Sequence, residues 1–430
     1  MPELFSSRSR RGFLATSAAA IVGSVAVLSA RNAVAAPDGS GIRPFRVRFP
    51  ERDLVDLARR VRATRWPDRE TVPDQTQGVP RATLLRLADY WTSRYDWRRV
   101  EARLNALPQF MTAIDGLDIH FIHVRSRHDN ALPLIVTHGW PGSVIEQLKI
   151  VGPLTDPTAH GGSTADAFHL VIPSIPGHGF SGKPTTVGWN PDRIARAWTE
   201  LMVNRLGYNR FVAQGGDWGA LITDRMAVQA PPALIGMHTN LPGAVPPAYD
   251  SAIRAGAMPP AGLPADENAA WLQLSDLYSR HVAYARFMGT RPQTLAGLAD
   301  TPVGLAAFML DHDVRSLDLI AAAFAGHPGG LSRDDVLDNI TLYWLTNTAV
   351  SAARLYWENP DSVVAAKGVR VPAAVSVFPD EVYQAPRGWV EKAYPNLLRY
   401  NRVAKGGHFA AWEQPQLFAE ELRAGFRPLR

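Results

Sequence analysis

Short apolar runs that do not alternate with polar residues recur in the middle and near the end of the chain. Helix-length segments separate most of these runs, which are Leu132–Val136, Phe168–Ile172, Phe211–Ala213, Leu234–Met237 and Ala373–Phe378. Strands that are apolar on both faces are typical of a parallel sheet that helices cover on both sides. The first strand signal differs, because Asp115-Gly116 predicts a hairpin turn before an alternating run. The pattern therefore predicts an α/β fold with a mostly parallel sheet.

Apolar residues spaced three and four positions apart indicate helices in two other regions. Near the N-terminus this spacing occurs in Leu54–Val61 and Leu84–Trp91, and prolines interrupt the stretch. It returns after residue 241, for instance at Leu274, Leu277 and Tyr278, where the strand signal vanishes. We therefore expect a helical lid inserted between two parts of one α/β core, with a meander of short helices before it. The expected meander, first core part, lid and second core part are residues 42–109, 110–241, 242–367 and 368–430.

The first 35 residues have the pattern of an export signal. Arg10-Arg11 precedes a weakly apolar run, and Ala33-Val34-Ala35 resembles a cleavage site, as in a twin-arginine signal. The apolar run, residues 15–30, has 16 residues, fewer than the roughly 20 that a membrane-spanning helix needs. We expect residues 1–35 to be a cleaved twin-arginine signal. The mature enzyme would then be periplasmic or extracellular, with no stable membrane span.

Composition excludes several kinds of chemistry. The 430-residue chain has a formal net charge of +5, and residues 1–35 supply +3 of it, which leaves no electrostatic case for nucleic acid. Cysteine is absent, which excludes disulfides, thiolate nucleophiles and cysteine-ligated zinc. His-Glu-x-x-His and EF-hand spacings are absent too, so no metal is expected. Gly177–Gly182 fits a dinucleotide-binding string, but Lys183-Pro184 follows where a helix should begin, so no cofactor is expected.

The sharpest motif is Gly215-Gly216-Asp217-Trp218-Gly219, between an apolar strand and a helical stretch. Small residues permit the tight strand-to-helix turn of Gly-x-nucleophile-x-Gly hydrolases, which usually carry serine in the middle. With Asp217 in that position, a carboxylate would attack a saturated carbon and form an alkyl-enzyme ester. The plainer alternative is a loop aspartate that caps the next helix.

Two further glycine-rich motifs fit the same chemistry. His138-Gly139-Trp140-Pro141-Gly142 follows a strand, so the backbone N–H groups of Trp140 and Trp218 are the expected oxyanion hole. Gly406-Gly407-His408 lies beyond the last strand, which matches the chain order nucleophile, acid, histidine. His408 is therefore the expected base. Its carboxylate partner should end the preceding strand, where Asp380 and Glu381 both qualify.

Together these residues resemble the microsomal-type epoxide hydrolases, an α/β-hydrolase family with an N-terminal meander and a helical lid. The resemblance extends from Phe45 to Pro428. It rests on a set of short motifs in a fixed order: Arg65-Trp66-Pro67, His138-Gly139-Trp140-Pro141-Gly142-Ser143, Pro173–Gly177, Ser181–Pro184, Gly216-Asp217-Trp218-Gly219 and Gly406–Ala411.

The resemblance implies roles that the residues alone leave open. A family glutamate follows Phe-Pro-x, which here makes Glu381 the acid and Asp380 the second choice. Two lid tyrosines bind the epoxide oxygen in the family, and the flanking motifs place them at Tyr284 and Tyr356. The neighbouring Tyr278 and Tyr343 are expected to be packing residues.

The expected function is hydrolysis of an apolar epoxide with water to a vicinal diol through an Asp217 alkyl-enzyme ester. The resemblance also implies a detoxification role, although an export signal here replaces the membrane anchor of the family's better-known members. A haloalkane dehalogenase of the same fold is the alternative, since it also uses an aspartate followed by tryptophan. A non-catalytic binding protein of this fold is a third possibility. The sequence leaves the oligomeric state open, with a homodimer as one option.

Overall fold

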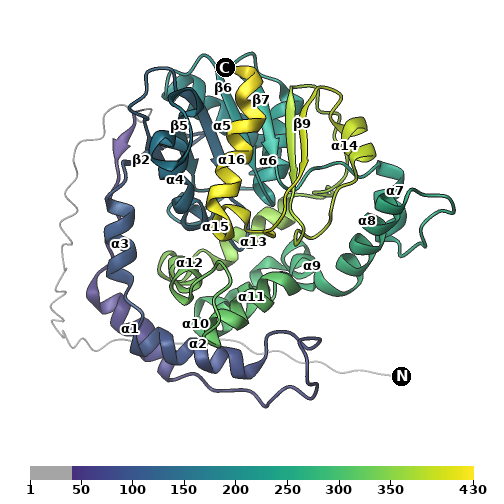
Figure 1. Cartoon of the computed structure of the whole chain (residues 1–430). Helices are drawn as coiled ribbons and strands as arrows, with labels where there is room; N and C mark the ends of the chain where they lie inside the picture. Colours follow the sequence, from purple (N-terminus) through teal and green to yellow (C-terminus); the bar gives the residue numbers. More distant parts are fainter. Residues whose placement is uncertain (1–40) are drawn as a thin grey trace, which may run out of the picture. The chain divides into compact units, whose positions relative to one another are not determined.

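A computed structural model of the chain describes residues 41–430. The predicted export signal, residues 1–35, lies outside these described residues. Within the described part, no helix combines the length and the apolar character needed to cross a membrane. Figure 1 shows this part of the chain in colours that run from purple near its start to yellow at residue 430.

One sheet forms the centre of the described structure. Its nine strands are ordered β1-β2-β3-β5-β4-β6-β7-β8-β9. The strands from β5 to β9 pair in parallel, whereas β1, β2, β3 and β5 pair antiparallel along one side. Their bounds are β1 (Arg43–Pro44), β2 (Gln109–Ile114), β3 (Leu117–Val124), β4 (Leu132–Thr137), β5 (Phe168–Pro173), β6 (Phe211–Gly215), β7 (Leu234–Thr239), β8 (Ala373–Val377) and β9 (Leu397–Arg402).

The strand pattern of the sequence is confirmed in this sheet. Each of the five unalternating runs falls on a strand from β4 to β8, and every residue of β5, β6 and β8 is buried. Asp115 and Gly116 form the β2–β3 hairpin turn, both with positive φ (50° and 76°) as a two-residue turn requires. One difference is the strand β1, which lies inside the region expected to be helical. The sequence pattern did not indicate it, because two residues are too few to produce a periodic signal.

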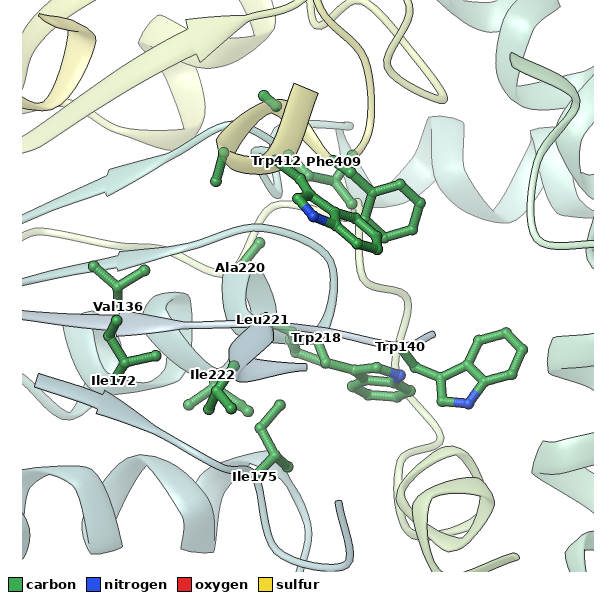
Figure 2. Close-up of a cluster of buried hydrophobic side chains, with 14 of the residues drawn as sticks. Val136, Trp140, Ile172, Ile175, Trp218, Ala220, Leu221, Ile222, Phe409 and Trp412 are labelled. Carbon is green, nitrogen blue, oxygen red and sulfur yellow. The ribbon is translucent and has the colours of Figure 1, made fainter. Parts of the chain in front are cut away.

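Helices cover the sheet. In the core, α6 contacts β4, β6, β7 and α5, while α16 contacts α4, β7 and β8 and crosses in front of the strands in Figure 1. Figure 2 shows part of the apolar cluster between these layers, with Val136 of β4, Ile172 of β5 and Ile222 of α6. The core helices are α4 (Val151–Thr155), α5 (Pro191–Glu200), α6 (Trp218–Gln229), α14 (Arg387–Ala393), α15 (Ala410–Glu413) and α16 (Pro415–Phe426).

Residues 242–367, the expected lid, contain a run of helices that leaves the core after β7 and returns before β8. The single backbone bridge Val245–Ala365 ties the two ends of this insertion together. The helices are α7 (Pro247–Arg254), α8 (Ala265–Asp276), α9 (Ala283–Thr290), α10 (Pro302–Leu310), α11 (Val314–Phe324), α12 (Arg333–Thr346) and α13 (Ala349–Glu358), with a π-helical turn at Leu277–His281 and a 3-10 helix at Pro292–Ala299.

The N-terminal helices pack on the lid rather than on the sheet. They are α1 (Glu51–Arg62), α2 (Arg81–Ser93) and α3 (Trp97–Asn105), and they contact α10, α11 and α12 (Figure 1). The buried residues Leu57 and Val61 of α1, and Leu84 and Leu87 of α2, occur at the helical spacing seen in the sequence. The meander therefore supports the lid from its outer side.

Candidate active site

The turn between β6 and α6 holds Asp217 in a backbone conformation that few non-glycine residues adopt. Its φ is 51° and its ψ is −127°, strain of the kind that accompanies an exposed side chain on a tight strand-to-helix turn. A Cβ on Gly215 would lie 1.9 Å from the Gly219 carbonyl oxygen, and a Cβ on Gly219 would lie 2.0 Å from the Thr137 carbonyl oxygen. The Asp217 side chain makes no capping hydrogen bond to α6. The glycines thus produce an elbow, and the helix-capping alternative does not describe Asp217.

The loop after β4 lies against this elbow. The backbone N–H of Trp140 donates a hydrogen bond of 2.8 Å to Asp217 Oδ1. A Cβ on Gly139 would lie 2.2 Å from the same oxygen, so the close approach requires glycine. Trp218, the other predicted donor, directly follows Asp217 as the first residue of α6. Both indoles lie beyond the carboxyl end of β4, away from Val136 (Figure 2).

Lid helix α12 holds that loop from the opposite side. The Tyr343 hydroxyl donates to the Gly142 carbonyl oxygen at 2.8 Å, and Asn339 Nδ2 donates to the Pro141 carbonyl oxygen at 2.6 Å. Tyr343 is fully buried, as expected of a packing residue, and its hydroxyl also fixes the loop. The lid therefore contributes to the position of the Trp140 N–H group.

His408 and Glu381 form a buried pair beside Asp217. Nδ1 of His408 lies 2.6 Å from Glu381 Oε1, and its Nε2 lies 3.4 Å from Asp217 Oδ2. Asp380, the other sequence candidate, has a half-exposed side chain 4.0 Å from Arg315. The structure therefore brings Asp217, His408 and Glu381 together and leaves the Asp380 side chain outside.

The loop that carries His408 is fixed by its own backbone. Gly406 has a φ of 111°, which favours glycine. The carboxylate of Glu413, in α15, accepts hydrogen bonds of 3.0 Å from the N–H groups of Gly407 and Phe409, on either side of His408. Burial raises the pKa of Glu413 to about 7. These contacts hold the imidazole toward the elbow.

Charges at close range set the protonation states of this centre. Burial opposes ionisation of Asp217, but the facing imidazoles of His312 and His408 outweigh it and hold the pKa of Asp217 well below its usual range. Burial opposes protonation of His408, yet the carboxylates of Glu381 and Asp217 raise its pKa well above the usual value. Asp217 is therefore an anion at neutral pH, and the two carboxylates beside His408 favour its protonated, imidazolium form.

Tyr284 and Tyr356 approach the same centre from lid helices α9 and α13. Their ring centroids are 6.1 Å apart. Tyr284 stacks on the Trp140 indole at 5.0 Å, and Tyr356 meets the Trp218 indole edge-on at 4.7 Å. Burial raises the pKa of both phenols well above the usual value, so both are proton donors at neutral pH.

These side chains line one cavity of about 610 Å³. Its volume is within the range of about 300–1,000 Å³ that is common for small-molecule sites. Aromatic and aliphatic side chains form much of its wall, and Leu277, Trp357 and Val382 are among them. Asp217, Tyr284, His312, Tyr356 and His408 lie in this wall. Other polar side chains in the wall include Arg254, Tyr278, Arg286 and Asp361, so Tyr278, expected to be a packing residue, also reaches the cavity.

Sequence reasoning missed His312, which occupies the turn between α10 and α11. Its Nε2 lies 3.8 Å from Asp217 Oδ2, and its Nδ1 lies 2.9 Å from Asp313 Oδ2. The available signal was a histidine between two aspartates, Asp311-His312-Asp313. No strand or glycine turn marks that position, so no local pattern singles it out.

Sequence reasoning also missed Glu146, a buried carboxyl that lines a small cavity together with Asp217. With Gln147, Asp217 and His408 it lines a small cavity of about 20 Å³, which is enough for about one water molecule. Burial raises the pKa of Glu146 to about 8, so it is largely protonated at neutral pH. Gln147 Nε2 donates to Glu146 Oε1 at 2.7 Å.

Asp217, His312 and His408 converge from three distant segments of the chain. One nitrogen or oxygen atom from each lies within 4.8 Å of the others. Asp217 Oδ2 is the ion-pair partner of Nε2 of both histidines, so charge pairing accounts for their proximity.

Known proteins are similar to this chain over most of its length. A family profile described as "Epoxide hydrolase N terminus" matches residues 42–147, and one described as "alpha/beta hydrolase fold" matches residues 133–294. A relative from Stigmatella aurantiaca is 51% identical over 392 residues, which cover 91% of this chain and 86% of the relative. Epoxide hydrolase 1 of Sus scrofa is 36% identical over 417 residues, which cover 90% of this chain and 89% of that protein.

Solved structures agree with the sequence matches. The crystal structure of juvenile hormone epoxide hydrolase from the silkworm Bombyx mori is 31% identical, with a TM-score of 0.79, and the match covers 91% of this chain and 96% of that one. The Aspergillus niger epoxide hydrolase is 29% identical, with a TM-score of 0.75 and coverage of 91% and 97%. The predicted resemblance and fold are confirmed: the chain belongs to the epoxide hydrolase family and has its α/β-hydrolase fold.

Proposed function

We propose that the protein hydrolyses an apolar epoxide to a vicinal diol through a covalent ester on Asp217. One observation carries the proposal. Asp217 is an ionised carboxylate on a strained elbow, at the wall of a cavity that also presents two protonated tyrosines and a histidine–carboxylate pair. Such a carboxylate is suited to attack on carbon, and the phenols are suited to protonate the oxygen that leaves it.

In the first step, Asp217 Oδ2 attacks one epoxide carbon. Oδ1 accepts the hydrogen bond from the Trp140 N–H, which leaves Oδ2 as the oxygen beside the imidazoles. The carbon–oxygen bond of the ring breaks, and the phenols of Tyr284 and Tyr356 hydrogen-bond the oxygen and supply its proton. The product of this step is a hydroxyalkyl ester of Asp217.

In the second step, water hydrolyses that ester. His408 Nε2 accepts a proton from the water, and Glu381 on its Nδ1 orients the ring and stabilises the imidazolium. The small cavity beside His408 and Asp217 has room for this water. The N–H groups of Trp140 and Trp218 would bind the developing oxyanion. In related acyl chemistry, each such donor stabilises the transition state by about 3–4 kcal/mol.

The cavity supports an apolar substrate. Its volume of about 610 Å³ and its aromatic and aliphatic wall suit a compact or elongated hydrocarbon epoxide better than a strongly polar one. A screen of terminal, aryl and bulky terpenoid epoxides tests this expectation. Preferred turnover of strongly polar epoxides, such as glycidol, over all of these would contradict it.

Intact-mass analysis tests the covalent step. His408→Gln should accumulate an adduct with the mass of protein plus epoxide, because ring opening continues while ester hydrolysis stops. The wild-type protein, incubated in parallel with a chloroalkane and with the epoxides, tests the haloalkane dehalogenase alternative. Chloride release by the wild-type protein without diol formation from any epoxide would favour that alternative, and no covalent adduct of His408→Gln with either compound would contradict the two-step scheme.

We also propose that residues 1–35 direct export by the twin-arginine route. The support is the sequence pattern alone, from Arg10-Arg11 to Ala33-Val34-Ala35. The test is the N-terminus of the protein recovered from a twin-arginine-competent host. A mature chain that begins near residue 36 is expected outside the cytoplasm, and replacement of both arginines by lysine should retain the full-length chain inside.

A further inference from the structure

His312 and Asp313 repeat, from the lid, the arrangement that His408 and Glu381 make from the core. Each histidine presents Nδ1 to a carboxylate, at 2.9 Å for His312 and 2.6 Å for His408, and Nε2 to Asp217 Oδ2, at 3.8 Å and 3.4 Å. The His312 side chain is 3% exposed, and its Nε2 is buried without a hydrogen-bond partner. A buried imidazole nitrogen aimed at the reacting oxygen calls for a chemical explanation.

Asp313 fixes the direction of this imidazole. One of its oxygens, Oδ1, accepts from the Ser316 N–H at 2.8 Å at the start of α11, which leaves Oδ2 for His312 Nδ1. A carboxylate on Nδ1 favours the tautomer with the proton there, and it stabilises the doubly protonated ring when Nε2 also binds a proton. His312 is thus held as a donor or acceptor toward the cavity.

The two histidines face different parts of the site. His408 lines the small cavity next to Glu146 and Gln147, where the hydrolytic water fits, whereas His312 is absent from its wall. His312 instead faces the tyrosine side, with its ring centroid 5.2 Å from that of Tyr284. The two imidazole centroids are 4.5 Å apart. Their positions therefore suit different steps, with His408 beside the water and His312 beside the phenols.

The charge balance of the site favours one extra proton on this pair of imidazoles. Three carboxylates, Asp217, Glu381 and Asp313, contact the two histidines. Within the described part of the chain, Asp217 forms its ion pairs with these two histidines. Burial and the neighbouring His408 oppose protonation of His312, but Asp217 and Asp313 outweigh them and raise its pKa. Since two adjacent imidazolium ions repel each other, one proton shared by the pair is the favoured state.

We propose that His312, paired with Asp313, delivers the proton shared by the two imidazoles to the ring-opening step, and that His408, neutral once this proton has been used, is the base for ester hydrolysis. This inference rests on the proposed function. As the bond from Asp217 Oδ2 to carbon forms and the ring carbon–oxygen bond breaks, the tyrosine pair gives a proton to the epoxide oxygen. His312 imidazolium then gives its Nε2 proton to the tyrosinate. Alkylation itself promotes this transfer, because the neutral ester no longer stabilises the imidazolium.

The cycle closes without another reactant. Water gives one proton to His408, and the hydroxide attacks the ester carbonyl. The ester bond to the diol oxygen breaks, and that oxygen takes the remaining hydroxide proton, which regenerates the Asp217 carboxylate. His408 imidazolium then passes its proton to His312 across the short distance between the rings. The balance is one epoxide plus one water to one diol.

Single-turnover kinetics separate the two histidines. Rapid quenching followed by intact-mass analysis, with styrene oxide as probe, gives the rate of ester formation and the rate of ester loss. His312→Gln should slow ester formation by about 10²-fold or more, within the range for general acid–base catalysis, and change ester loss less than about threefold. His408→Gln should do the opposite. Slower ester loss in His312→Gln, or no change in either rate, would overturn the proposal.

The pH dependence of ester formation adds a readout that a purely structural role would not change. In the wild-type protein this rate should fall as rising pH removes the His312 proton, and in His312→Gln the fall should disappear. The titratable groups that face His312 are Asp217 from the elbow, His408 from the C-terminal loop, Tyr284 from α9, and Asp311 and Asp313 beside it. The same pH dependence in wild type and His312→Gln would contradict the assignment.

Two further variants protect the test from misfolding and from failure of the parent mechanism. Asp313→Asn keeps a side chain that can cap α11, and it should slow ester formation in the same direction but less. His281→Gln is the matched control, because it removes another lid histidine that pairs with an aspartate. His281 Nε2 lies 3.2 Å from Asp276 Oδ2. The rates of ester formation and of ester loss in this variant should equal those of the wild-type protein. If the wild-type protein forms no ester, the proposed function fails; if it does and both His312→Gln and Asp313→Asn form it normally, this inference alone fails.

Discussion

The core and the lid each contribute part of the site, but they hold their residues in different ways. Asp217 and His408 occupy glycine-rich turns after strands, and Glu381 lies in the loop just beyond β8 (Ala373–Val377), so the order of strands in the sheet fixes them. Tyr284, His312 and Tyr356 belong to helices or to the turn between helices, so side-chain packing fixes them. The proposed two-step chemistry follows the same division: in the proposal, ring opening by Asp217 needs the lid donors, and ester hydrolysis needs core residues alone.

The lid is held at both of its surfaces. On its inner side, Asn339 and Tyr343 of α12 bond the loop that carries Trp140. On its outer side, the meander contacts it through the Arg60–Asp300 ion pair (2.7 Å) and other polar contacts. A lid fixed on both sides can keep proton donors at a constant distance from Asp217. We therefore expect the meander to affect catalysis through the lid, since it contacts the lid helices.

The largest effect should come from the core nucleophile. Asp217→Asn retains the size of the side chain, and asparagine tolerates a positive φ better than most residues, but it lacks a nucleophilic carboxylate. The turnover number for diol formation should fall by about 10⁴-fold or more, the scale seen when a nucleophile is removed. Diol formation by gas chromatography, with melting temperature as the control for folding, checks this. Undiminished diol formation would remove Asp217 from the mechanism.

The lid donors should have the next largest effect. Tyr284→Phe and Tyr356→Phe each remove one proton donor, and each should slow ester formation by about 10²–10⁴-fold. Ester loss should change little, because the water and His408 are on the core side. In the His408→Gln background, either tyrosine variant should therefore accumulate ester more slowly. If the phenylalanine variants accumulate ester as fast as their parent, the phenols do not act in ring opening.

The same division explains how much the sequence could predict. A tight turn restricts residue types, so glycines around Asp217 and His408 are visible in the sequence, as are the apolar runs of β4 to β8. The choice of Glu381 over Asp380 depends on one step along the backbone, which required the resemblance. Tyr284 and Tyr356 also required it. His312 was missed because helix packing, without a local backbone constraint, brings it to Asp217.

A buried core acid should affect stability in a pH-dependent way. The pKa of Glu146 is about 8 in the folded protein, above the usual value near 4.5, so the unfolded chain loses this proton at lower pH than the folded protein does. Wild-type stability should therefore fall by up to about 1.4 kcal/mol per pH unit between about pH 4.5 and 8 through this group, and level off above.

Glu146→Gln removes that titration while retaining an oxygen that can accept from Gln147. The variant should differ little from wild type at pH 5, and its advantage in free energy of unfolding should grow toward pH 8. Urea unfolding at both pH values measures the difference. An equal difference between the two proteins at pH 5 and at pH 8 would mean that Glu146 does not ionise in this window.

The smallest effect should come from the contact between meander and lid. Trp91 Nε1 of α2 donates to Thr341 Oγ1 of α12 at 3.0 Å, and both side chains are buried. Trp91→Phe keeps an aromatic ring but leaves the hydroxyl without this donor, which should cost about 1–3 kcal/mol of stability. Thr341→Val removes the other partner.

The double variant then tests whether this contact transmits its effect to the lid. Because Trp91→Phe and Thr341→Val remove one shared bond, their combined loss in free energy of unfolding should be smaller than the sum of the single losses. Ester formation should slow modestly in each single variant, since α12 also holds the loop of Trp140, and ester loss should slow no more than ester formation. Additive losses, or a slowing confined to ester loss, would show that the meander supports the core instead of the lid.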